Sequence, residues 1–104
     1  PLSHAGYTCL VPTLLRGGCL YVPPLFSPDA FFDMVEQHRI NATMLVPVML
    51  YTLLDSERAA SADMSSMVSI FYGASAISPV RLREALEKWG KIFAQFYGQT
   101  EAPT

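Results

Sequence analysis

Short apolar runs alternate with helical segments along this chain, and this alternation restricts its fold more than any other feature. Two helices begin at Ser27-Pro28 and Ser78-Pro79, where a hydroxyl can cap the first turn and proline occupies the first helical position. The second helix carries apolar residues at the i, i+3, i+4, i+7 spacing of an amphipathic helix. These residues are Leu82, Ala85, Leu86 and Trp89.

The complete pattern is four helices interleaved with four strands. We predict helices over residues 5–15, 27–39, 47–54 and 78–89, and strands over residues 19–22, 42–46, 67–72 and 92–96. The first helix is apolar on nearly all sides, which predicts burial, and Pro12 should kink it or start a new turn. The intervals between strands suit crossover connections, so we expect an α/β fold with a mostly parallel sheet and crossover helices.

The composition is apolar for a chain of this size. With 104 residues the chain holds one domain at most, and 51% of its residues are hydrophobic whereas only 15% are charged. A small domain with so few charged residues should expose apolar surface. We therefore predict either that the isolated chain self-associates or that other parts of a larger protein bury this surface. The formal net charge is −2, so the composition does not indicate a basic surface that would bind nucleic acid or anionic lipid.

Several sequence features indicate a cytoplasmic protein. Cys9 and Cys19 lack the spacing of a zinc or redox motif, so buried free thiols in a reducing cytosol are favoured over a disulfide. The first residues lack the basic region of a signal peptide. The longest apolar runs, such as residues 44–51, are too short to cross a bilayer, and this one contains Pro47.

A chemically mixed cluster, Tyr97-Gly98-Gln99-Thr100-Glu101, follows the last predicted strand. Its aromatic ring offers a stacking face, and its glycine allows a ligand to approach the backbone closely. Its hydroxyl can donate to a phosphate oxygen, and its carboxylate is a hard oxygen ligand suited to Mg²⁺. A polar turn that merely closes a strand would have a similar composition.

A second segment of small residues, Gly73-Ala74-Ser75, follows the predicted strand 67–72. In a parallel sheet the C-terminal ends of the strands share one edge, so this segment and Tyr97–Glu101 should line the same edge. Two such segments at one edge favour a nucleotide site more strongly than either segment does alone.

The chain resembles the adenylate-forming superfamily, and most closely its fatty-acyl-CoA synthetases (acyl-CoA ligases, AMP-binding enzymes). The resemblance extends over the whole chain and is most specific at its two strand-end motifs. The matching motifs are Pro1-Leu2-Ser3-His4, Gly17-Gly18, Val46-Pro47, Asp63-Met64-Ser65-Ser66, Tyr72-Gly73-Ala74-Ser75 and Tyr97-Gly98-Gln99-Thr100-Glu101. Ser3 departs from the pattern, because the family usually has an aromatic residue there. The resemblance implies that residues 1–104 are a partial domain, a three-layer-like piece of the family's larger N-terminal domain.

The resemblance also implies a role for each site residue. Gly73, Ala74 and Ser75 would line the adenine pocket through their backbone. Tyr97 would lie against the adenine ring, Gly98 would let the acyl carbonyl region approach, and Gln99 would belong to the same nucleotide-binding residues.

At the reacting end, Thr100 would hydrogen-bond the phosphates and Glu101 would ligate Mg²⁺. His4 would stand beside the reacting carboxylate, and Gly6 would lie near the acyl channel. Without the resemblance, a capping or near-core position would be the preferred interpretation of His4.

The implied reaction couples a carboxylic acid, with fatty acids favoured, to ATP, and then transfers the acyl group from AMP to coenzyme A. The family's phosphate-binding loop, its catalytic lysine and its ribose-binding aspartate are not found in the sequence, and Lys88 and Lys91 lie in the wrong elements to substitute. We therefore expect no activity from the isolated chain. Three alternatives stay open: a non-catalytic adenine-nucleotide-binding module, an adenylation domain of another branch (aryl-CoA ligase, peptide synthetase or luciferase-like), and a structural interaction unit.

Overall fold

A sheet of three parallel strands forms the centre of the protein, as a computed structural model of residues 5–99 and 101 shows. The strands are β1 (Ala42–Leu45), β2 (Ser69–Gly73) and β3 (Phe93–Phe96), and they lie in the order β1-β2-β3. Ala42 pairs with Ser69 across the first interface, and Ile70 pairs with Phe93 across the second. The predicted α/β class and the parallel sheet are therefore confirmed.

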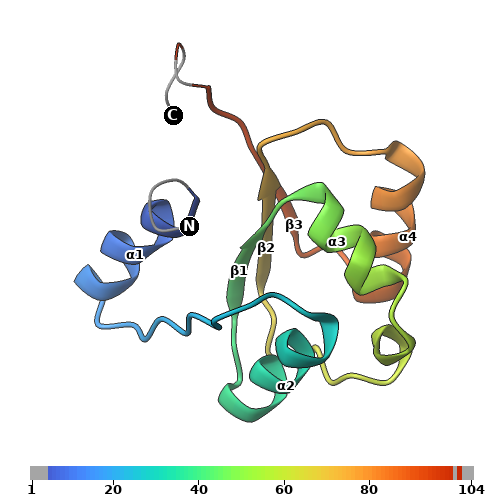
Figure 1. Cartoon of the computed structure of the whole chain (residues 1–104), viewed down its shortest axis with the longest axis horizontal. Helices are drawn as coiled ribbons and strands as arrows, with labels where there is room; N and C mark the ends of the chain where they lie inside the picture. Colours follow the sequence, from blue (N-terminus) through green and yellow to red (C-terminus); the bar gives the residue numbers. More distant parts are fainter. Residues whose placement is uncertain (1–4, 100, 102–104) are drawn as a thin grey trace.

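Helices lie on both sides of this sheet. Figure 1 shows α1 on the left of the strands, α3 and α4 on the right, and α2 below. Each strand is separated from the next by a helical connection, which a parallel pair requires. The helical elements are α1 (Ala5–Leu15), α2 (Pro28–His38), α3 (Pro47–Leu54), the short 3₁₀ helix η1 (Glu57–Ala60) and α4 (Pro79–Trp89).

Both Ser-Pro pairs begin helices, but only one of the two serines uses its hydroxyl as a cap. Ser27 Oγ accepts a hydrogen bond from the backbone N–H of Ala30 at 3.2 Å. Ser78 occupies the equivalent place before α4 and makes no side-chain cap bond. The positions of both helix starts were thus predicted correctly, whereas the expected capping bond forms only at α2.

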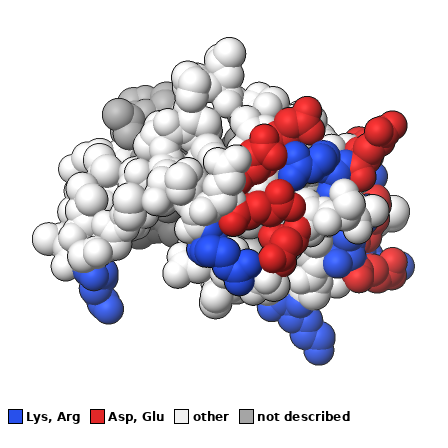
Figure 2. All heavy atoms as spheres, turned by 90° about the horizontal axis from the view of Figure 1, so that it is seen from below, with Lys and Arg blue, Asp and Glu red and all other residues white. Residues whose placement is uncertain are grey.

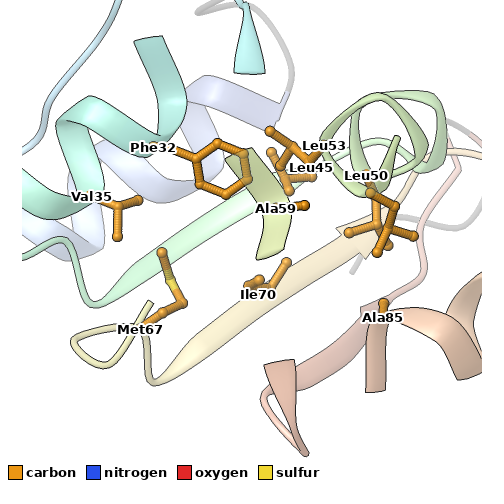
Figure 3. Close-up of a cluster of buried hydrophobic side chains, with 10 residues drawn as sticks. Phe32, Val35, Leu45, Leu50, Leu53, Ala59, Met67, Ile70 and Ala85 are labelled. Carbon is orange, nitrogen blue, oxygen red and sulfur yellow. The ribbon is translucent and has the colours of Figure 1, made fainter. Parts of the chain in front are cut away.

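The hydrophobic core lies between the sheet and the helices α2, α3, η1 and α4. Phe32, Leu50, Leu53 and Ile70 are fully buried in it. Figure 3 shows Ile70 on the middle strand with side chains from the surrounding helices converging above it. Burying one such side chain contributes about 1.5–3 kcal/mol, so these contacts fix α2 and α3 against the sheet.

The first helix is exposed, which corrects the prediction that it is buried. The side chains of Tyr7, Leu14 and Leu15 are 58%, 56% and 81% exposed. Pro12 lies inside α1, and the helix continues past it. Within the described residues, too few side chains reach the apolar surface of this helix to cover it.

The predicted strand at residues 19–22 does not form, because β structure needs a neighbouring strand and none of the three described strands pairs with this segment. Tyr21 instead stacks on His38 of α2, with ring centroids 4.2 Å apart. Cys9 and Cys19 are free, as predicted, but Cys9 is half-buried and Cys19 is exposed.

Charged side chains are unevenly distributed over the face drawn in Figure 2. Acidic and basic groups gather on its right side, whereas its left side is largely uncharged. On the charged side, Arg58 of η1 bridges Asp33 and Glu36 of α2 at 2.7 and 2.9 Å. The hydrogen bond to Asp33 raises the pKa of Arg58.

Across the described part of the chain, each helix is too short or too polar to cross a membrane.

Candidate functional site

The C-terminal ends of β2 and β3 lie side by side. Gly73, the last residue of β2, pairs with Phe96, the last residue of β3. A Cβ atom built on Gly73 would stand 2.2 Å from the carbonyl oxygen of Phe96, far inside contact distance. The two chain segments that follow these strands therefore leave the sheet next to one another at its upper edge in Figure 1, as the sequence predicted.

The segment after β2 begins with a residue in an unusual backbone conformation. Ala74 has a φ of 69° and so lies in the left-handed region. For a residue with a Cβ atom, that conformation costs about 1–2 kcal/mol, and it persists only where the surrounding structure enforces it. Ala74 and Ser75 are exposed, so their backbone groups are accessible at the sheet edge.

The segment after β3 presents its side chains to solvent. The Tyr97 side chain is 65% exposed. Gly98, Gln99 and Glu101 are also exposed. An accessible aromatic face and a carboxylate therefore follow β3, and Figure 1 shows this segment turning away from the one that follows β2 once both have left the sheet.

Two of the predicted catalytic residues, His4 and Thr100, lie outside the described residues. Of the others, the structure places Gly73 next to Phe96, the residue that precedes Tyr97, Gly98 and Gln99. Gly6 lies in the first turn of α1.

A cluster on α3 and α4 holds the far end of the segment after β2. The backbone N–H of Ser78 donates to the phenolic oxygen of Tyr51 at 2.7 Å. Arg81 lies over the Tyr51 ring, 5.3 Å from its centroid, and donates from Nη2 to the Tyr51 carbonyl oxygen at 3.1 Å. Arg81 also pairs with Asp55 at 2.6 Å, and this hydrogen bond raises the pKa of Arg81.

This cluster was not predicted from the sequence. Residues 44–51 were interpreted as an apolar run too short to cross a bilayer, and Arg81 was assigned no role. Tyr51 and Arg81 are thirty positions apart, and no local pattern connects them.

The chemistry of the available donors limits how a metal could bind at this edge. No group of three or more His, Cys, Asp or Glu side chains is assembled for a metal among the residues that the structure describes. Among the residues that the structure describes, Glu101 supplies one carboxylate to the segment that begins at Tyr97. Mg²⁺ usually takes one or two protein carboxylates and completes its shell with water and substrate phosphates. One carboxylate fits that mode of binding and does not fit a cage made of protein ligands alone.

A family model described as "AMP-binding enzyme" matches residues 1–104, which is the entire chain. The chain belongs to the AMP-binding enzyme family. This membership agrees with the resemblance seen in the sequence motifs and with the parallel-sheet fold.

Curated AMP-binding relatives include ligases for different acids. The chain is 52% identical to the medium/long-chain-fatty-acid–CoA ligase FadD8 of Mycobacterium tuberculosis, and the match covers 99% of the chain and 18% of that protein. It is 40% identical to the indoleacetate–CoA ligase of Aromatoleum aromaticum, over 97% of the chain and 20% of that protein. The chain thus spans about a fifth of the length of these relatives.

Solved structures of AMP-binding enzymes contain the same arrangement of elements. The amide bond synthetase McbA of Marinactinospora thermotolerans superposes with a TM-score of 0.93 at 33% identity, over 99% of the chain and 21% of that protein. The o-succinylbenzoate CoA synthetase MenE of Bacillus subtilis superposes with a TM-score of 0.84 at 26% identity, over 97% and 20%. The fold of this segment is therefore that of the family.

Proposed function

We propose that this chain is part of an AMP-forming acyl-CoA ligase, which activates a carboxylic acid with ATP and then transfers the acyl group to coenzyme A. The observation that supports the proposal is the pairing of Gly73 with Phe96, from which the two family motifs start at neighbouring strand ends on one sheet edge. A medium- or long-chain fatty acid is the favoured substrate, because the identity to a ligase named for those acids is 52%, against 40% for the indoleacetate ligase.

The chemistry explains why these residue types are needed. In the first step an acid carboxylate attacks the α-phosphorus of ATP, and both reactants are anions. Rate acceleration therefore depends on alignment and charge neutralisation rather than on proton transfer. Bound Mg²⁺ would supply positive charge to the phosphate oxygens.

The proposed roles divide along the sheet edge. Residues 73–75, Tyr97 and Gln99 bind the adenine nucleotide, while Gly98 leaves room for the acyl carbonyl region. Thr100 donates to the phosphates, Glu101 is the magnesium ligand and His4 orients the reacting carboxylate. Coenzyme A enters after pyrophosphate has left.

We also infer that the isolated 104-residue chain has no turnover, since the family's phosphate-binding loop and catalytic lysine are not found in its sequence. A cytoplasmic location is proposed from the two free thiols, Cys9 and Cys19, which suit a reducing compartment.

The deciding experiment is carboxylate-dependent exchange of labelled pyrophosphate into ATP, catalysed by the full-length protein that contains this segment. Fatty acids of increasing chain length are compared with indoleacetate and other aryl acids. We expect the highest exchange rate with a medium or long fatty acid. Glu101→Gln and Thr100→Val should each lower the rate about a hundredfold, whereas Glu87→Gln, an exposed change on α4, should not.

Two results would redirect the proposal. Faster exchange with aryl acids would assign the protein to the aryl-CoA branch. Micromolar ATP binding without exchange for any acid would support the non-catalytic nucleotide-binding module instead.

A further inference from the structure

The loop of residues 74–77 is fixed at both of its ends. At one end, Gly73 is locked into the sheet by its close pairing with Phe96. At the other end, the backbone N–H of Ser78 is held by the hydroxyl of Tyr51 at 2.7 Å. Four residues between two fixed points leave little freedom, which accounts for the left-handed conformation that Ala74 maintains.

The second anchor is itself held in place by a network of contacts. Arg81 covers the Tyr51 ring and binds the Tyr51 carbonyl oxygen, while its other contacts reach Asp55 at 2.6 Å and Glu84 at 2.6 Å. The Arg81 side chain is only 25% exposed, whereas that of Asp55 is 67% exposed. Tyr51 therefore has a fixed ring and a fixed backbone, so its hydroxyl stands at a defined point beside the start of α4.

We propose that Tyr51, supported by Arg81, is a positioning residue for the adenine nucleotide: its hydroxyl keeps the loop of residues 74–77 in the conformation that binds the base. This inference rests on the proposed function, in which residues 73–75 line the adenine pocket. Tyr51 contacts the loop through Ser78, and its role is to prevent the loop from relaxing away from the conformation that Ala74 adopts.

The test measures AMP and pyrophosphate binding by calorimetry in the full-length protein that contains this segment. Tyr51→Phe removes the acceptor of the Ser78 N–H and keeps the ring beneath Arg81. We expect AMP affinity to fall about three- to tenfold, the range for loss of one hydrogen bond. Pyrophosphate affinity should stay within about twofold of the wild-type value, because pyrophosphate lacks the base.

Two further measurements separate positioning from general loosening. Hydrogen exchange at the Ser78 amide should accelerate in Tyr51→Phe. Adding Ala74→Gly should restore part of the AMP affinity, because glycine adopts positive φ without the penalty that alanine meets. Tyr21→Phe is the matched control, since the Tyr21 ring stacks on His38 of α2, and it should leave both affinities unchanged.

The possible results are distinct. Unchanged AMP affinity in a folded Tyr51→Phe protein would overturn the inference and leave the proposed function standing. A parallel loss of AMP and pyrophosphate affinity would also overturn it, since that pattern indicates general destabilisation. Failure of the wild-type protein to bind AMP would refute the proposed function, and the inference would fall with it.

Discussion

Gly73 on β2 and Phe96 on β3 approach so closely that a Cβ atom at residue 73 would stand 2.2 Å from the Phe96 carbonyl oxygen. This backbone contact sets the spacing of the two segments that make up the candidate site. The distance between them is therefore determined by main-chain packing at the strand ends rather than by the long side chains around the edge.

Gly73→Ala should force the ends of β2 and β3 apart. Overpacking of this kind typically costs about 1–3 kcal/mol, and denaturant unfolding of the chain would measure it. Val68→Ala, an exposed change just before β2, is the control and should shift the free energy of unfolding by less than about 0.5 kcal/mol. Equal stability of the Gly73 variant and wild type would contradict the contact.

Ala74→Gly should stabilise the protein although it removes a methyl group. The left-handed conformation at φ 69° is unfavourable for alanine and accessible to glycine. The gain is about 1 kcal/mol at most, because glycine also loses more backbone entropy on folding. A loss of stability in thermal unfolding would show that the methyl group makes a contact worth more than the strain.

Leu53→Ala should open a cavity in the core, at a cost of about 2–5 kcal/mol. Leu53 is fully buried on α3, whereas Val48 on the same helix is 65% exposed. Val48→Ala therefore serves as the matched control for helix propensity and should change stability little. Similar effects for the two variants would place the core elsewhere.

The pH dependence of stability should show a contribution from Asp63. Hydrogen bonds from Ser65 hold the pKa of Asp63 below its ordinary value of 3.8, and Arg39 at 3.0 Å acts in the same direction. A carboxylate with a depressed folded pKa contributes stability above its unfolded pKa and loses it as the pH falls through the folded value.

Asp63→Asn should accordingly lower the Tm at pH 6, and the difference from wild type should close as the pH falls below 3.8. The effect should be small because both side chains are more than half exposed. A difference that persists undiminished at pH 3 would assign the effect to something other than charge.

The isolated chain should self-associate through the uncharged surface of α1. Leu14 and Leu15 lie exposed there, and Leu15 has 81% of its surface accessible. Leu15→Lys should shift light scattering at high concentration toward the monomer, since a desolvated ammonium opposes association. Val80→Lys on the charged side should leave the association unchanged. A monomeric wild-type chain would contradict the prediction.

Local signals predicted the elements that depend on local physics. Ser27-Pro28 marked the start of α2 because capping and proline geometry act within one turn. The strand at residues 19–22 was predicted wrongly because a strand needs a partner, and propensity alone cannot report whether one is present. The prediction that α1 is buried was wrong for a similar reason, since apolar composition does not specify which other residues pack against a helix.

Part of the candidate site could be predicted from local sequence patterns. That β2 and β3 end next to one another at the same edge of the sheet followed from parallel pairing, which alternating elements imply. The support from Tyr51 and Arg81 was not accessible, because it joins two helices through a hydroxyl, a guanidinium and main-chain atoms. Such contacts depend on how the helices pack against one another, and no periodic pattern in the sequence predicts them.

The strand order has a consequence for how this segment meets other polypeptide. β1 and β3 are the outer strands of the three-stranded sheet, so within the described ranges each has one ladder partner. An outer strand displays backbone donors and acceptors that a further strand can join at a separation of about 4.8 Å. The sheet can thus be widened on either flank without disturbing the Gly73–Phe96 junction, which lies inside the β2–β3 ladder.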